Sequence, residues 1–107
     1  MTMSKIDVQT LKKWRDENTE HQLIDVREPW EVEIGHINGL HIAMDCFLDS
    51  IEKVRRDIPV VIHCKSGTRS AAVVHHLIKQ LGYENVNDLE GGINAWSNEV
   101  DSNIEVA

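Results

Sequence analysis

The sequence predicts an α/β fold, a parallel β-sheet with helices on both faces, and three observations lead to this prediction. Short apolar runs that suit β-strands alternate along the chain with amphipathic segments that suit helices. The central run, Val60 to Ile62, holds only β-branched apolar residues, as is typical of a strand covered on both faces. The 107 residues suffice for one hydrophobic core, and no Pro/Gly-rich linker or internal repeat divides them. We therefore expect one domain over residues 1–107, with its core at about 6–96.

The first predicted elements are a helix and a strand. An amphipathic helix is predicted from Asp7, a suitable N-cap, to about Glu17, because apolar residues recur there at threefold spacing: Val8, Leu11 and Trp14. The apolar run Leu23–Val26 then predicts a short strand. Asp25, near the C-terminal end of this strand, is its one charged residue.

The next part of the chain predicts a turn, a strand and a second helix. Pro29 suits the first turn of a helix, and residues 35–39 contain two glycines of a loop. Residues 40–43 predict another short strand. Residues 45–56 predict a helix that Pro59 prevents from continuing, because apolar residues recur there at helical spacing: Phe47, Ile51 and Val54.

After the central strand the chain predicts two more helices around a strand. The first helix ends at Gly82, a good C-cap residue, and carries one apolar stripe: Val74, Leu77, Ile78 and Leu81. Residues 86–89 predict a strand, and residues 93–96 lie in a short final helix. The polar composition of residues 97–107 predicts a loosely held tail.

Composition and charge narrow the classes of function. A formal charge of −7 disfavours general nucleic-acid binding, since the 11 Lys and Arg residues are scattered. No apolar stretch is long enough to span a bilayer, and no apolar run of a secretory signal follows Lys5, so we expect a cytoplasmic protein without a membrane partner. In that compartment Cys46 and Cys64 are expected to be free thiols.

Cys64 is the strongest candidate for chemistry. It follows the central strand directly, and a glycine-containing loop leads from it into a helix, so backbone N–H groups and a helix N-terminus converge on the thiol. Such surroundings bring a thiol pKa from about 8.5 to roughly 3.5–7.5. One helix dipole contributes only about 0.3–1 kcal/mol, so loop N–H groups and nearby cations must add to it. Lys65 and Arg69 are the cations available.

Three stretches, in this order, resemble the signatures of the rhodanese family of sulfurtransferases. The first runs from Leu23 to Glu28 and on through Glu31 to the Gly35–Gly39 loop. The second, Cys64–Ser70, resembles the active-site loop of the family, and the third, Leu89–Trp96, resembles its closing signature. The resemblance covers about residues 6–96.

The resemblance implies a fold and an activity. The fold would be a five-stranded parallel sheet flanked by helices, as a single rhodanese module. The activity would be thiosulfate sulfurtransferase: a nucleophilic cysteine takes the outer sulfur of a small anionic donor, holds it as a persulfide and passes it to cyanide, a thiol or a sulfur-accepting protein. No metal or organic cofactor is implied.

The resemblance also suggests residue roles. Cys64 would be the catalytic nucleophile, and the substrate-binding loop would hold the sulfur: Lys65, Ser66, Gly67, Thr68 and Arg69. Lys65 would face the sulfonate end of thiosulfate. Arg69 would support the loop, with Asp25 at the neighbouring strand end as its expected partner. Asp25 and Arg27 are the supporting residues of the first signature.

Two other functions are alternatives to sulfur transfer. Phosphatases and arsenate reductases with a similar loop have five residues between cysteine and arginine, whereas only four separate Cys64 from Arg69, which favours sulfur chemistry. A non-catalytic interaction or sulfur-carrying module is the third alternative. An interaction module would be expected to lack the nucleophile, whereas a sulfur carrier would have the same sequence.

Other chemistry-bearing residues have simpler interpretations. His63 precedes Cys64 on a strand, so its ring is expected to face away from the thiol. The histidine spacing does not match a metal site. Cys46 is interpreted as a small apolar filler rather than a resolving thiol. Tryptophans 14, 30 and 96 are expected to pack, and the acidic pair Glu28 and Glu31 suits a helix N-terminus.

Overall fold

The computed structural model describes residues 4–107, and its centre is a five-stranded parallel sheet. The strand order is β1-β5-β4-β2-β3, so β4, which leads to Cys64, lies in the middle. The strands are β1 (Lys5–Ile6), β2 (Gln22–Asp25), β3 (Leu40–His41), β4 (Val60–His63) and β5 (Val86–Leu89). The predicted α/β class is confirmed, and β1, a strand of two residues, is an addition to the predicted elements.

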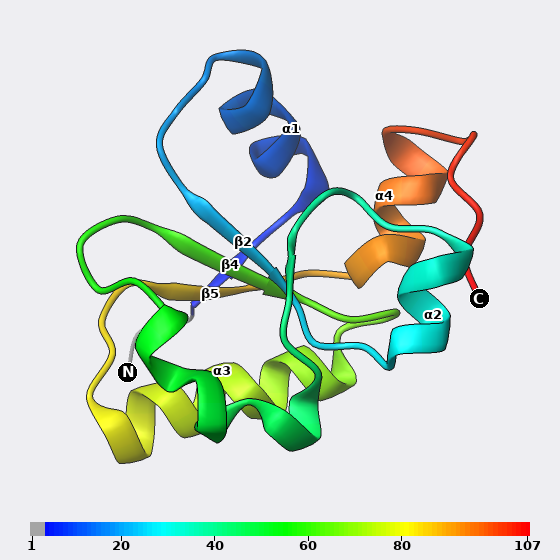
Figure 1. Ribbon diagram of the computed structural model, residues 1–107. Coiled ribbons are helices and arrows are strands. Elements are labelled where there is room, and N and C mark those ends of the chain that lie inside the picture. Colours follow the sequence, from blue (N-terminus) through cyan, green and yellow to red (C-terminus); the bar gives the residue numbers. More distant parts are fainter. Residues whose placement is uncertain (1–3) are drawn as a thin grey trace.

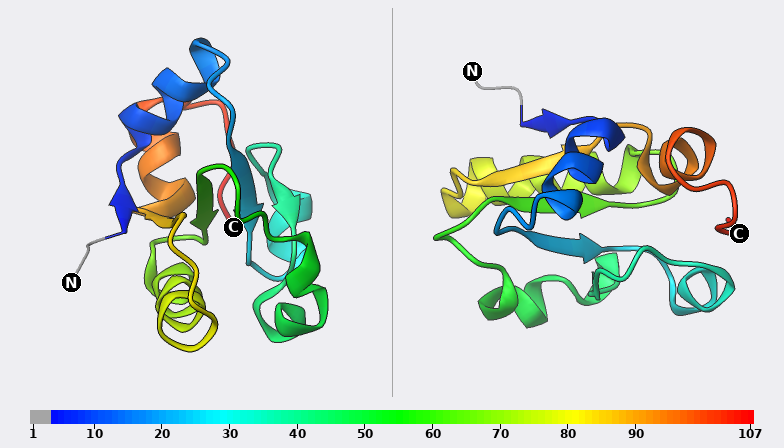
Figure 2. Two further views of the ribbon diagram at one scale, coloured as in Figure 1. Left: turned by 90° about the vertical axis from the view of Figure 1, so that its left-hand side faces the viewer. Right: turned by 90° about the horizontal axis from the view of Figure 1, so that it is seen from above.

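Helices cover both faces of this sheet (Figure 1). On one face lie α1 (Val8–Asp16) and α4 (Gly92–Glu99), and on the other lies α3 (Thr68–Leu81) with the 3-10 helices η1 (Met44–Cys46) and η2 (Leu48–Lys53). The two layers stand above and below the sheet in Figure 2, left. The helix α2 (Pro29–Ile34) lies beyond the carboxyl ends of the strands, on the side where the site is built.

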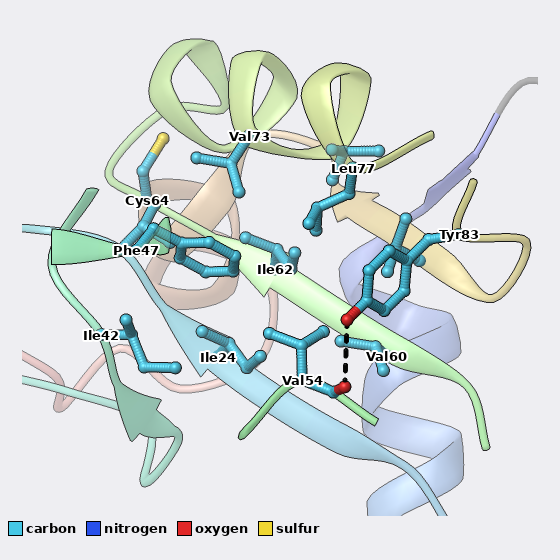
Figure 3. Close-up of a cluster of buried hydrophobic side chains, with 13 residues drawn as sticks. Ile24, Ile42, Phe47, Val54, Val60, Ile62, Cys64, Val73, Leu77 and Tyr83 are labelled. Carbon is cyan, nitrogen blue, oxygen red and sulfur yellow. Dashed lines mark hydrogen bonds between the residues drawn. The ribbon is translucent and has the colours of Figure 1, made fainter. Parts of the chain in front are cut away.

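Alternation along the strands divides the core into two clusters. Ile24 and Ile62 face α3, whereas their neighbours Leu23 and Val61 face α1 and α4, because successive strand residues point to opposite faces. Figure 3 shows the α3-side cluster, in which Phe47, Val73 and Leu77 pack over Ile62. Cys64 lies at the edge of this cluster, so the buried side chains of the core hold the candidate nucleophile in place.

Local signals in the sequence account for the helix ends. The Asp7 carboxylate accepts a hydrogen bond from the Thr10 N–H at 2.8 Å, which is the expected N-cap of α1. Pro29 occupies the first turn of α2. The chain leaves α3 through Gly82 in the left-handed conformation, with φ at +70°.

Residues 45–56 differ from the predicted helix. They form two short 3-10 helices, and Ser50, with φ −117° and ψ 21°, interrupts the second. Phe47 and Val54 are buried and Ile51 packs against the same cluster, whereas Leu48 is 57% exposed, so the apolar spacing marks contact points on the core. Short 3-10 turns are sufficient to bring these contact points onto the sheet.

The tail is packed rather than loose. The side chains of Ile104 and Val106 lie against the cluster under α1 and α4, and the Ser97 hydroxyl donates to the Ile104 carbonyl at 3.3 Å. A Cβ added to Gly35 would lie 1.9 Å from the Glu105 carbonyl oxygen, so the tail touches the end of α2. These few apolar residues explain why overall polarity mispredicts this segment.

Two of the three tryptophans pack as expected. Trp96 is 6% exposed and Trp14 packs at the edge of the same cluster, but Trp30 on α2 is 59% exposed, so the packing role predicted for it is wrong. Within residues 4–107 no helix has the length and apolar character needed to cross a membrane.

Candidate active site

The site is built where β4 ends and α3 begins. Cys64 follows the last strand residue, His63, and Gly67 turns the chain with φ at +113° into the first residue of α3. The N-terminus of α4 holds this loop from the other side, because the N–H groups of Ile93 and Asn94 donate to the carbonyls of Cys64 and Lys65, both at 3.0 Å. Two helix N-termini therefore frame the loop.

The Cys64 sulfur receives hydrogen bonds from three groups. They are the N–H of Gly67 at 3.1 Å, the N–H of Ser70 at 3.5 Å and the Ser70 hydroxyl at 3.4 Å. The Cys64 residue is 1% exposed, and Figure 3 shows its side chain pointing toward the N-terminal end of α3. Burial opposes ionisation, but the hydrogen bonds from Ser70 and Gly67, with the nearby backbone of Ser66, outweigh it and lower the pKa of the Cys64 thiol.

The remaining loop residues differ in their exposure to solvent. Lys65, Ser66 and Thr68 are exposed, and Gly67 is half-buried. The Lys65 ammonium makes no ion pair with any residue of the described chain, 4–107. Its charge is thus available to an approaching anion.

Arg69 supports the loop through a different partner than expected. Its guanidinium donates to both oxygens of Glu31 on α2, at 2.7 and 3.0 Å, so the predicted pairing of Arg69 with Asp25 is wrong. Glu31 is 4% exposed, and Arg69 holds the pKa of its carboxyl below the usual range. Glu31 also accepts from the Glu28 N–H at 3.0 Å, so the expected N-terminal role of Glu31 is correct but incomplete.

Asp25 and Arg27 instead pair with each other at the end of β2. The Arg27 side chain is 0% exposed and donates to the Asp25 carboxylate at 2.8–3.2 Å, and its Nη2 also donates to the Gly35 carbonyl at 2.8 Å. Burial opposes ionisation of Asp25, but Arg27 and His63 outweigh it and lower the pKa of the carboxyl. Neither side chain bonds the Cys64 sulfur, so both act as structural support.

The His63 ring lies away from the sulfur, in agreement with the prediction. Its Nδ1 lies 3.3 Å from the Cys64 carbonyl oxygen and its Nε2 lies 3.6 Å from Asp25. Burial lowers the pKa of His63, which keeps the ring neutral near pH 7. A general-base role for His63 therefore has no geometric support.

Cys46 differs from the buried filler that the sequence predicts. It lies exposed on η1, and the carboxylate of Asp45 raises the pKa of its thiol. Cys46 and Cys64 are both free. Residues 4–107 contain no group of three or more His, Cys, Asp or Glu side chains arranged to hold a metal ion.

Sequence reasoning missed Ser70, Asp88 and Gly92. Ser70 is 0% exposed and donates to the Cys64 sulfur, and its hydroxyl also bonds Asp88. Gly92 lies so close to the loop that an added Cβ would be 2.5 Å from the Cys64 carbonyl oxygen. An acidic residue inside the strand pattern of residues 86–89 was the available signal for Asp88.

Comparison with known proteins gives consistent matches. The sequence model of the protein family described as the rhodanese-like domain matches residues 7–99 of this chain. YtwF of Bacillus subtilis is 38% identical over 100 residues, which cover 92% of this chain and 95% of that protein. An Allochromatium vinosum protein named sulfurtransferase is 33% identical over 96 residues, 89% of each chain.

Solved structures and longer relatives extend this comparison. A rhodanese-like domain protein from Staphylococcus aureus superposes with a TM-score of 0.82 at 32% identity, over 98% of this chain and 99% of that one. The adenylyltransferase/sulfurtransferase MoeZ of Mycobacterium tuberculosis is 35% identical over 91% of this chain, but the chain spans only a quarter of MoeZ. With a family model over most of its length and relatives of matching size above 30% identity, the chain belongs to the rhodanese-like domain family.

Proposed function

We propose that this protein is a sulfurtransferase that moves a sulfane sulfur from a small anionic donor, such as thiosulfate, to a thiophilic acceptor through a persulfide on Cys64. The single observation that carries the proposal is the set of hydrogen bonds that Gly67 and Ser70 donate to the Cys64 sulfur. They favour the thiolate, the form of cysteine that is nucleophilic. The family match and the relatives named sulfurtransferases support the same reaction class.

The reaction would consist of two displacements at sulfur. In the first, the Cys64 thiolate attacks the outer sulfur of thiosulfate, the new S–S bond forms, and the old one breaks with its electron pair leaving on sulfite. In the second, cyanide or a thiolate attacks the terminal sulfur of the persulfide, and Cys64 leaves as a thiolate. Such a covalent intermediate predicts ping-pong kinetics. A cellular thiol or a sulfur-accepting protein would replace cyanide, the acceptor used in assays.

The arrangement of Arg69 also favours sulfur transfer over phosphatase or arsenate reductase chemistry. Its terminal nitrogens are both engaged by Glu31, so they point to α2. A phosphate cradle would instead need its guanidinium directed at the anion. Together with the four-residue spacing from Cys64, this pairing makes the loop a poor fit for a phosphate or arsenate that an arginine must hold.

The test measures, by intact mass, whether the protein takes up and releases a sulfur atom. Incubation with thiosulfate is expected to add the mass of one sulfur atom to the intact chain, and a cyanide chase is expected to release thiocyanate and remove that mass. Cys64→Ser should abolish both results, whereas Cys46→Ser should retain both and serves as the matched control. An active Cys64→Ser protein would exclude the mechanism, and turnover of a phosphate ester by the unmodified protein would favour the phosphatase alternative.

A further inference from the structure

Two buried aspartates lie near the carboxyl ends of β2 and β5, on either side of β4, but have different partners. Asp25 on β2 is neutralised by the Arg27 guanidinium. Asp88 on β5 is 4% exposed, and in residues 4–107 it has no ion pair; the hydrogen-bond partner of its carboxyl is the Ser70 hydroxyl. A buried carboxylate without a cationic partner is costly, so this environment favours the protonated acid.

The register of the sheet places Asp88 beside the nucleophile. Asp88 pairs with Ile62 of β4, which faces α3, so the carboxyl lies on the same face as Ser70. Its Oδ2 would be 3.8 Å from a Cβ added to Gly67, which locates the carboxyl beneath the active-site loop. Ser70 is therefore the direct link between Asp88 and Cys64.

The Ser70 hydroxyl has one proton and three acceptors. They are the Cys64 sulfur at 3.4 Å, the Gly67 carbonyl at 3.3 Å and Asp88 Oδ1. If Asp88 is ionised, its carboxylate is the stronger acceptor and takes the hydroxyl proton away from the sulfur. If Asp88 is protonated, it donates to Ser70, and the hydroxyl is free to donate to the Cys64 thiolate.

The charges around Asp88 agree with a site that holds one negative charge. Burial raises the pKa of the Asp88 carboxyl, the Ser70 hydrogen bond and Lys5 on β1 oppose the rise, and Glu90 adds to it. The neighbouring thiol has its pKa lowered. The two groups thus approach each other in proton affinity, as two groups that share one proton must.

We propose that Cys64 and Asp88 share one proton through Ser70. As the Cys64 thiol passes its proton to the Ser70 oxygen, Ser70 passes its own proton to Asp88 Oδ1. The products are a thiolate, a neutral carboxylic acid and a hydroxyl that now donates to the thiolate, so the total charge and the number of protons are unchanged. Asp88 is a positioning residue that acts on the sulfur through Ser70.

The use of this relay in turnover rests on the proposed sulfur transfer. The shared proton would prepare the thiolate for attack on the donor. When Cys64 leaves the persulfide as a thiolate, the acid on Asp88 and the Ser70 hydroxyl would stabilise it. The relay itself exists in the resting protein, so it is tested without any sulfur donor.

The first test measures the rate at which iodoacetamide alkylates Cys64 as a function of pH, in a Cys46→Ser background. Asp88→Asn keeps the shape and the donor to Ser70 but removes the acid, so it should convert a two-step profile into one step at the lower midpoint. Between the two midpoints of the unmodified protein the rate should rise severalfold, because the sulfur no longer shares a proton with the carboxyl and one pKa unit corresponds to about tenfold. Glu90→Gln removes a nearby charge without a bond to Ser70 and should change the rate less than about twofold.

The Ser70→Ala background separates the relay from simple repulsion. Without the hydroxyl, Asp88→Asn should change the alkylation rate less than about twofold. An equal effect of Asp88→Asn with and without Ser70 would mean that Asp88 acts through space only, and the relay would be wrong.

The second test leaves Ser70 and Asp88 intact, in case their variants do not fold. The carboxyl ¹³C shift of Asp88 is followed against pH in the Cys46→Ser protein before and after alkylation of Cys64. A coupled pair predicts two steps before alkylation and one after it. A titration curve that alkylation leaves unchanged would overturn the relay, whereas a coupled curve in a protein that transfers no sulfur would refute only the proposed function.

Discussion

At the scale of single residues, the thiol of Cys64 and the ammonium of Lys65 have opposite surroundings. The thiol is buried among hydrogen-bond donors, whereas the ammonium is exposed beside it and has no carboxylate partner in residues 4–107. The hydrogen-bond donors around Cys64 lower the pKa of its thiol. The exposed charge of Lys65 raises the concentration of anions near the site, which is a weaker effect because water and salt screen exposed charges.

Lys65→Ala is therefore expected to raise the KM for thiosulfate about two- to fivefold at low salt, since one exposed charge contributes up to about 1 kcal/mol. The change for an uncharged persulfide donor should be negligible, and added salt should reduce the difference for thiosulfate. Lys79→Ala, an exposed lysine in the last turn of α3, is the control. Equal effects of Lys65→Ala on both donors would exclude a role of Lys65 in binding the anion.

At the scale of elements, the site depends on how closely α4 approaches the loop after β4. Gly92 opens α4 with φ at +56°, and an added Cβ would lie 2.5 Å from the Cys64 carbonyl oxygen and 2.6 Å from that of Lys65. Gly82 has a similar φ of +70°, but nothing lies within 4 Å of its added Cβ. Substitutions of these two glycines therefore separate two free-energy costs, that of a left-handed backbone for a residue with a Cβ and that of overlap between a Cβ and the loop carbonyls.

Gly82→Ala is expected to lower the free energy of unfolding by about 1–2 kcal/mol, the cost of a left-handed conformation for a residue with a Cβ. Gly92→Ala should cost at least about 3 kcal/mol, because overlap with two carbonyls adds to that cost. Urea unfolding measures both values, and Cys64 alkylation should slow only in Gly92→Ala. Similar losses of stability in the two variants would mean that α4 can move away without consequence.

At the scale of the whole molecule, the buried Asp25–Arg27 pair connects three parts of the fold. It closes the end of β2, its carboxylate lies 3.6 Å from His63 of β4, and Arg27 bonds the carbonyl of Gly35 at the end of α2. The Asp25 pKa is lowered on folding, so ionised Asp25 stabilises the protein above its unfolded pKa of about 3.9, and this contribution is lost as pH falls further.

Asp25→Asn is expected to cost about 3–5 kcal/mol of stability at neutral pH, since it leaves the Arg27 charge buried without its partner. The difference from the unmodified protein should shrink as pH falls below about 4, because the unfolded chain protonates Asp25 there while folding still holds the carboxyl ionised. Urea unfolding at several pH values measures this. Asp57→Asn removes the exposed partner of Arg55 and should leave the free energy of unfolding almost unchanged, because water screens this pair. A pH-independent difference would show that Asp25 contributes shape and not charge.

Features carried by neighbouring residues could be predicted from the sequence. Apolar periodicity predicts β4 and α3, Gly82 marks the end of that helix, and the placement of Cys64 at the carboxyl end of a central strand follows from their order. The helix predicted for residues 45–56 and the loose tail predicted for residues 97–107 were wrong for the same reason. A spacing of apolar residues reports contact points, and only the surface they meet decides whether an α-helix, a 3-10 turn or a packed coil joins them.

The sequence by itself determined the α/β class, the family signatures and the position of the candidate nucleophile at the end of a strand, because local patterns along the chain carry each of these. Only the tertiary structure decided which charges pair. Asp25 bonds Arg27, two residues away, while Arg69 reaches 38 positions back to Glu31, and Asp88 reaches Cys64 through Ser70. Which side chains of different elements pair depends on the order and register of the strands, because these bring strand ends and helix N-termini together. The spacing of residues along the sequence does not specify these contacts.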